Sequence, residues 1–153
     1  MTIAPIIQQV EVKCAPAKAF ALFVERMGDW WPRGKTVGKG PHVEIVVEPH
    51  ADGRWYERDA EGNEVQWGKV LAWEPPGRAL FGWQLGSDWQ YDPDFLTELE
   101  LTFVALPSGS TRVTLEHRDL ERFGDLADKR RAELNGGWPT RIADFAAFAD
   151  GED

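Results

Sequence analysis

Short segments in which apolar and polar residues alternate fill the middle of the chain, from Val43 to Asp119. Alternation with a period of two places every second side chain on the same face of a strand, and it is typical of an antiparallel sheet with one buried face. Turns of a few residues join the segments, so neighbours in sequence should pair as hairpins. The pattern therefore predicts an antiparallel sheet whose apolar side chains, Leu99, Leu101 and Phe103 among them, face a covering helix.

The expected strands are bounded by Gly, Pro, Asn, Asp and Ser, which favour turns. These strands are Ile6–Lys13, Val43–Glu48, Gly53–Asp59, Val65–Glu74, Arg78–Leu85, Phe95–Leu106 and Thr111–Asp119. Between the first two, Pro16 should begin a short helix, because its missing N–H costs nothing in a first turn. Met27–Pro32 should be a second short helix or turn, and the Gly- and Lys-rich segment Arg33–Pro41 should be a loop.

Two helical segments are expected at the end of the chain. The first is the polar stretch Leu120–Asn135, after which Gly136 and Gly137 should interrupt the helix. Pro139 would then lie near the first turn of a second helix, whose apolar residues, including Phe145, recur at helical spacing. One strand, two short helices, a run of hairpins and a terminal helix indicate an α+β fold of about six to seven strands, in which the terminal helix is the one long element able to cover the apolar face.

Tryptophan is unusually frequent, with eight in 153 residues. Trp55, Trp67 and Trp83 fall on expected strands, and Trp138 falls at the start of the expected last helix. Indoles are broad and apolar and carry a single N–H donor, which suits the wall of a ligand cavity. The sequence therefore predicts either a tryptophan-lined cavity or a core built from large residues.

Two polar residues are candidates for chemistry inside such a cavity. His117 shares a strand face with Val113 and Leu115, so it should point inward. It would then bind a ligand oxygen or transfer a proton, or serve as a structural histidine bonded to the backbone. Glu57 shares a face with Trp55 if the strand is regular, where a buried carboxyl group could act as acid or base. The alternative for Glu57 is an outward charge near a hairpin.

Composition excludes several classes of protein. A net charge of −9 argues against binding to nucleic acid and to anionic membrane surfaces. No apolar run approaches the length of a membrane helix. Cys14 is the sole cysteine, which excludes an internal disulfide, and no secretory signal is visible at the start of the sequence. We therefore expect one cytoplasmic domain, and because no metal-ligand spacing or nucleotide motif occurs, we expect no metal and no cofactor.

Short pieces spread over nearly the whole chain resemble the SRPBCC (START-like, Bet v 1-like) superfamily and, within it, the domain of activators of the Hsp90 ATPase. These pieces are Pro16–Phe20, Asp29–Pro32, Gly53–Glu57, Trp67–Pro76, Gly109–Arg118 and Gly137-Trp138. The resemblance implies a helix-grip fold, in which a curved antiparallel sheet wraps around a long C-terminal helix. In that layout the pair Trp30-Trp31 would lie at the open end of the sheet, as a cavity mouth, a partner surface or a packing plug.

The leading functional hypothesis is non-catalytic binding of a hydrophobic or amphipathic small molecule between the sheet and the last helix. The residues expected to line that site are Trp55, Glu57, Trp67, Trp83, Leu99, Leu101, Phe103, His117, Trp138 and Phe145. One alternative, implied by the family resemblance, is an Hsp90-type co-chaperone or regulatory module that acts through its surface. Another is a cyclase- or hydrolase-type enzyme with Glu57 and His117 as acid and base. The chain would be a monomer or a homodimer.

Overall fold

The computed structural model describes residues 3–32 and 34–151, and within them seven strands form one antiparallel sheet in the order β1-β7-β6-β5-β4-β3-β2. The strands are β1 (Ile6–Val12), β2 (His42–Val47), β3 (Arg54–Asp59), β4 (Glu64–Glu74), β5 (Arg78–Trp83), β6 (Thr97–Ala105) and β7 (Thr111–Arg118). From β2 to β7 each strand pairs with the next one along the chain, and β1 pairs with β7. The predicted antiparallel sheet is confirmed.

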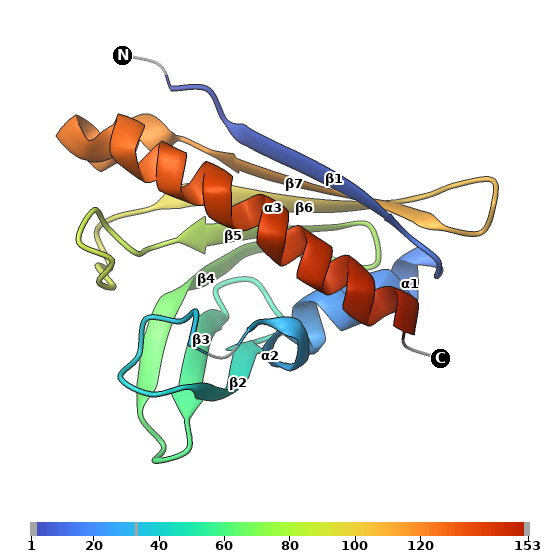
Figure 1. Ribbon diagram of the computed structural model, residues 1–153, viewed down its shortest axis with the longest axis horizontal. Coiled ribbons are helices and arrows are strands. Elements are labelled where there is room, and N and C mark those ends of the chain that lie inside the picture. Colours follow the sequence, from blue (N-terminus) through green and yellow to red (C-terminus); the bar gives the residue numbers. More distant parts are fainter. Residues whose placement is uncertain (1–2, 33, 152–153) are drawn as a thin grey trace.

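Helices occupy the two remaining parts of the chain. Between β1 and β2 lie α1 (Pro16–Phe20), a π-helical turn η1 (Ala21–Glu25) and α2 (Met27–Trp30). A 3-10 helix η2 (Leu120–Leu126) and the long helix α3 (Ala127–Gly151) follow β7. Figure 1 shows α3 crossing one face of the sheet, with α1 near the C-terminal end of α3. This arrangement is the helix-grip fold that the resemblance implies.

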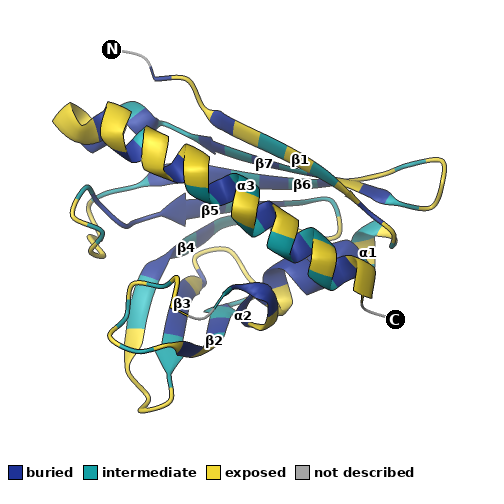
Figure 2. Cartoon of the chain, viewed as in Figure 1, coloured by how far each residue is buried: buried dark blue, intermediate teal, exposed yellow. Residues whose placement is uncertain are grey.

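Burial alternates along the central strands as the sequence pattern predicts. In β6 the side chains of Thr97, Leu99, Leu101 and Phe103 are buried, whereas the residues between them are partly exposed. The buried side of the sheet faces α3, which turns its own buried residues toward the strands (Figure 2). The core therefore fills the space between the concave face of the sheet and the helices.

Irregular pairing helps to curl the sheet. The register shifts between Trp55 and Tyr56, where β3 pairs with β4, and again between Val70 and Ala72, where β4 pairs with β5. A bulge adds a residue to one strand, bends that strand and increases its twist. Figure 1 shows β2 and β3 turned away from the central strands, as this added twist favours.

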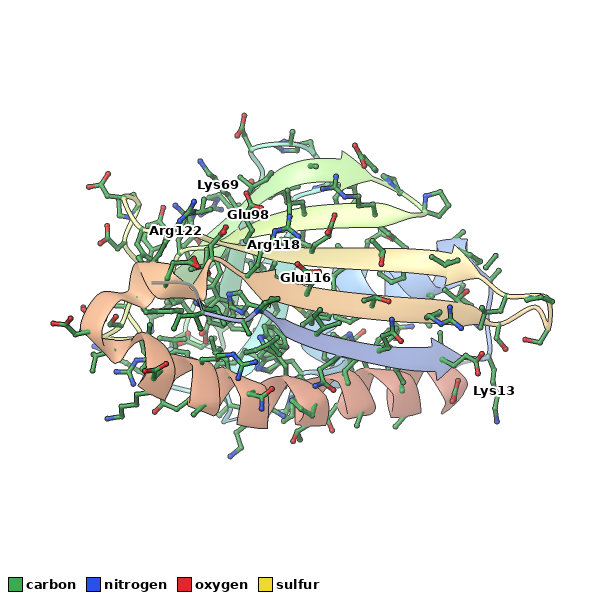
Figure 3. The ribbon with its side chains drawn as sticks, turned by 90° about the horizontal axis from the view of Figure 1, so that it is seen from above. Lys13, Lys69, Glu98, Glu116, Arg118 and Arg122 are labelled. Atoms are coloured by element: carbon green, nitrogen blue, oxygen red, sulfur yellow. The ribbon has the colours of Figure 1, made fainter. Side chains whose placement is uncertain are left out.

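The outer face of the sheet carries ion pairs, with a few exposed apolar side chains such as Val104 among them. Arg118 lies across from Glu98 on the paired strand, with 2.8 Å between Nη2 and Oε1, and it also contacts Glu100 and Glu116. Figure 3 shows Glu98, Glu116 and Arg118 close together on β6 and β7. The polar half of each alternating strand therefore faces away from the core.

One prediction about the end of the chain is wrong. Gly136 and Gly137 do not interrupt the helix, because α3 runs unbroken from Ala127 to Gly151 with Pro139 inside it. The helical backbone is interrupted earlier, at Gly124 in η2, where φ is 68° and so lies outside the helical region. The buried residues of α3 recur every three to four positions at Leu134, Trp138, Ile142, Phe145 and Ala149. Their burial against the sheet outweighs the roughly 1 kcal/mol by which each glycine weakens a helix.

Candidate functional site

A pocket of about 430 Å³ opens between α3, the strands β4 and β5, and the loop before β2. Its lining residues are Trp31, Lys35, Thr36, Val37, Trp67, Trp83, Leu85, Trp89, Glu133, Leu134, Gly137, Trp138 and Arg141. This volume lies within the range of about 300–1,000 Å³ that small-molecule sites occupy. We refer to this space below as the tryptophan pocket.

Among the described residues, five indole rings line the tryptophan pocket. Trp31 lies between Trp67 and Trp138, with ring centroids 5.0 and 6.0 Å away. Trp83 lies 5.8 Å from Trp138 and 6.3 Å from Trp89. The rings meet at steep angles, so they enclose the space from several sides instead of stacking on one another. Such a wall offers flat apolar surfaces in more than one direction.

The N–H groups of four of these indoles are bonded within the protein. Trp31 donates to the carbonyl of Lys35 at 3.0 Å, and Trp83 donates to the carbonyl of Leu85 at 3.1 Å. Trp67 donates to the carboxylate of Glu57 at 2.8 Å, and Trp138 donates to His117 at 3.1 Å. These bonds fix the ring orientations and leave ring carbon atoms as the surface that a ligand would meet.

His117 is a buried link between β6 and α3. Its Nδ1 accepts from the indole of Trp138 at 3.1 Å, and its Nε2 lies 2.8 Å from the hydroxyl oxygen of Thr97. An indole can only donate, so Nδ1 is the unprotonated nitrogen and Nε2–H donates to Thr97. Burial lowers the pKa of His117 from 6.5 to about 3. The ring is therefore neutral at pH 7 with both nitrogens bonded. This fits a structural histidine better than proton transfer, although its partners are the side chains of Thr97 and Trp138 and not the backbone that the sequence led us to expect.

Glu57 points inward and fixes the loop before β2. One carboxylate oxygen, Oε1, accepts from the backbone N–H of Val37 at 2.9 Å, from that of Gly38 at 3.2 Å and from Trp67. A side chain at position 38 would place Cβ 2.8 Å from the other carboxylate oxygen, so glycine leaves room for this close approach. Glu57 thus joins the loop segment that contains Lys35, Thr36 and Val37 to the tryptophan wall.

The other expected site residues lie in the core. Trp55 is fully buried behind the wall, with its ring centroid 5.5 Å from Trp67 and 6.0 Å from Trp83. Phe103 and Phe145 pack on Phe23. Of the ten expected site residues, the structure brings Trp67, Trp83 and Trp138 to the pocket surface and places the others outside its lining, namely Trp55, Glu57, Leu99, Leu101, Phe103, His117 and Phe145.

Sequence reasoning predicted Trp138 but missed the other lining residues that α3 contributes. Leu134, Gly137, Trp138 and Arg141 line the tryptophan pocket at positions i, i+3, i+4 and i+7 of one helix face. That spacing is visible in the sequence, but an expected helix break at Gly136 and Gly137 conceals it. The two residues of the pair Trp30-Trp31 differ in their roles. Trp30 is packed in the core, whereas Trp31 lines the pocket.

In residues 3–32 and 34–151, no helix is long and apolar enough to cross a membrane. Across the same described residues, no group of three or more His, Cys, Asp or Glu side chains is placed to hold a metal ion.

Solved structures resemble this chain over nearly its full length. An anthrahydroquino-γ-pyrone synthase, Txn09, is 36% identical over 95% of this chain and 97% of its own, with a TM-score of 0.68. The self-sacrificing resistance protein CalC from Micromonospora echinospora is 32% identical over 95% and 94% of the two chains, with a TM-score of 0.69.

More distant structures share the fold alone. The Aha1 dimer from Colwellia psychrerythraea is 14% identical over 97% of this chain and 98% of its own, with a TM-score of 0.67. No family model and no curated protein matches the sequence. The helix-grip architecture, together with more than 30% identity to Txn09 and CalC across almost the whole length, assigns the chain to the SRPBCC (START-like, Bet v 1-like) superfamily.

Proposed function

We propose that the protein binds a flat, largely apolar small molecule in the tryptophan pocket and does so without catalysis. The observation that carries this proposal is the indole wall, in which Trp31, Trp67, Trp83 and Trp138 surround a space of about 430 Å³. Their N–H groups are bonded to the protein, so they offer ring surface for stacking instead of free donors. Edge-to-face and offset contacts between aromatic rings each contribute about 0.5–1.5 kcal/mol beyond the burial of area.

The relatives support a planar aromatic ligand. Txn09, at 36% identity, is described as a synthase of an anthrahydroquino-γ-pyrone, and that name denotes a flat system of fused rings. A site with tryptophan rings on several sides is complementary to such a shape. We therefore propose polycyclic aromatic compounds as the ligand class.

The two residues considered for acid–base chemistry favour a binding role over an enzymatic one. Both nitrogens of His117 and the Oε1 atom of Glu57 are bonded within the protein, and neither residue is part of the pocket lining. General acid–base catalysis needs a group within hydrogen-bond reach of the substrate. Glu57 and His117 therefore serve the architecture of the site in this proposal.

A second candidate function is a cyclase-type enzyme, and the identity to Txn09 is the observation that favours it. Such an enzyme would act mainly by holding a flexible substrate in a folded shape, with charged groups of the lining in place of Glu57 and His117. Incubation with a ligand followed by mass spectrometry separates the two candidates, because a binding protein returns its ligand unchanged. No observation favours a chaperone partner, since the likeness to Aha1 is one of fold.

A pair of adjacent glycines on α3 offers a clean test of the binding site. Gly137 lines the tryptophan pocket, whereas Gly136 is exposed, and an added Cβ would meet nothing within 4 Å at either position. Gly137→Leu should fill the pocket, and Gly136→Leu is the matched control. Both changes replace a helical glycine and should leave stability equal or raise it by up to about 1 kcal/mol.

Binding is measured by the quenching of tryptophan emission during titration with a neutral planar probe, anthraquinone-2-carboxamide. We expect saturable quenching of the unmodified protein and of Gly136→Leu, and at least tenfold weaker binding to Gly137→Leu. Equal affinity in all three proteins would place the probe elsewhere and contradict the proposed site. Absence of saturable binding to the unmodified protein would reject this ligand class.

A further inference from the structure

The net charge of the residues that line the tryptophan pocket is positive, whereas the net charge of the whole protein is negative. The chain has a net charge of −9. Among the described lining residues, however, the charged side chains are two cations, Lys35 and Arg141, and one anion, Glu133. An acidic protein that places basic groups at an apolar pocket has a local preference for negative charge.

The single acid of the lining is already neutralised. Glu133 accepts from Nη1 of Arg130 at 2.7 Å, and Arg130 is itself not part of the lining. The guanidinium of Arg130 also donates to the carbonyl of Ser87, which holds it beside Glu133. A ligand in the pocket therefore meets Glu133 as half of an ion pair and meets Lys35 and Arg141 as the remaining charges.

Trp31 contacts both of the residues that carry the positive charges, Lys35 and Arg141. The guanidinium carbon of Arg141 lies 5.7 Å from the ring centroid of Trp31, and the indole N–H of Trp31 donates to the carbonyl of Lys35 at 3.0 Å. Lys35 is held there because Glu57 binds the following backbone N–H groups of the same loop. The two cations thus come from the loop and from α3, and both residues contact the same indole.

Both cations can accept a further partner. Within residues 3–32 and 34–151, Lys35 forms no salt bridge. Arg141 uses Nη1 for Asp144 at 3.1 Å, and the Asp144 side chain is 36% exposed, so water screens this pair. The Arg141 side chain is only 15% exposed, and a guanidinium group carries five N–H donors in total. Donors remain for an anionic oxygen that approaches from the pocket.

We infer that the ligand of the tryptophan pocket is an acidic aromatic compound, whose carboxylate or ionised phenolic oxygen binds between Lys35 and Arg141 while its rings lie among Trp67, Trp83 and Trp138. This inference rests on the proposed function, because it names the ligand class of the same site. A charge near low-dielectric aromatic walls interacts more strongly with a cation than it does in bulk water. The acid group therefore supplies orientation as well as affinity.

The test compares two probes that differ in one group, anthraquinone-2-carboxylate and anthraquinone-2-carboxamide. Their dissociation constants are measured by tryptophan quenching at low and at high ionic strength. The unmodified protein should bind the carboxylate at least tenfold more tightly at low salt, and this preference should shrink as salt increases. The preference is the ratio of the two dissociation constants.

Variants then identify the groups responsible. Lys35→Met and Arg141→Gln should each lower the carboxylate preference by about three- to tenfold, and the double variant should bring the ratio near one. Lys39→Met, an exposed site in the same loop, and Lys129→Met, an exposed site on α3, are controls that should keep the preference. Binding of the carboxamide should stay within twofold in every variant, which shows that the pocket is intact.

Two outcomes would overturn the inference, and they are distinguishable. Equal affinity for carboxylate and carboxamide in the unmodified protein, or a preference that survives in the double variant, removes the acidic ligand and leaves the proposed function standing. Absence of saturable binding by both probes rejects the proposed function together with the inference.

Discussion

The buried histidine allows a prediction about stability whose size follows from the structure. His117 is neutral in the folded protein, because burial lowers its pKa from 6.5 to about 3. In the unfolded chain the same side chain takes up a proton near pH 6.5. Between these two values the unfolded state binds more protons than the native state does, so the free energy of unfolding falls as the pH falls.

The magnitude comes from the difference between the two pKa values. One pKa unit corresponds to 1.36 kcal/mol, so lowering the pH from 7.5 to 5.0 should cost about 2 kcal/mol through this residue alone. The change to make is His117→Gln, because a glutamine amide can accept from Trp138 and donate to Thr97 but does not titrate. The replacement will carry a cost of its own, but that cost should not depend on pH.

Urea unfolding at pH 7.5 and pH 5.0 measures the effect for both proteins. The stability advantage of the unmodified protein over His117→Gln should shrink by about 2 kcal/mol at the lower pH. Carboxyl groups titrate in both proteins, so their contributions cancel in the difference. His50→Gln is a control that removes a histidine from an exposed turn and leaves the buried network intact. If the difference between the unmodified protein and His117→Gln is the same at both pH values, the argument from burial is wrong.

Two further changes test how the site is supported. Glu57→Leu leaves three donors without their acceptor, so unfolding should require about 3 kcal/mol less, and the amides of Val37 and Gly38 should exchange hydrogen faster. Glu57→Gln keeps an oxygen acceptor and should lose less, which urea titration and exchange measured by NMR would both show. Gly68→Ala places Cβ 1.8 Å from a carbonyl oxygen of the neighbouring strand and should cost at least about 2 kcal/mol. Gly77→Ala, where Cβ would meet nothing within 4 Å, should leave the thermal midpoint nearly unchanged.

The sheet could be predicted from sequence because its signals are local. Leu99, Leu101 and Phe103 alternate with polar residues, and each is buried on the face that the alternation selects. Turn residues such as Gly62 and Gly109 adopt positive φ where the hairpins reverse. Since each strand pairs mainly with its neighbour in sequence, local patterns suffice to establish most of the topology.

The terminal helix shows where local signals fail. Two adjacent glycines and a proline favour a break, yet α3 continues through all three. The preference of each residue amounts to about 1 kcal/mol for glycine and about 3 kcal/mol for proline. Burial of Leu134, Trp138 and their neighbours on the sheet outweighs that sum, and a sequence window contains no information about the surface they contact.

For the candidate site, too, the sequence determined some features and the tertiary structure determined the others. The sequence by itself determined that tryptophans lie on strands and at the last helix, but it left open whether Trp67 and Trp83 share a face. It could not separate Trp55, which is buried behind the wall, from Trp67 and Trp83, which line the pocket. That distinction depends on the curl of the sheet, the path of α3 and the loop held by Glu57. Only the tertiary structure decides these, because they arise from contacts between residues that are far apart in the chain.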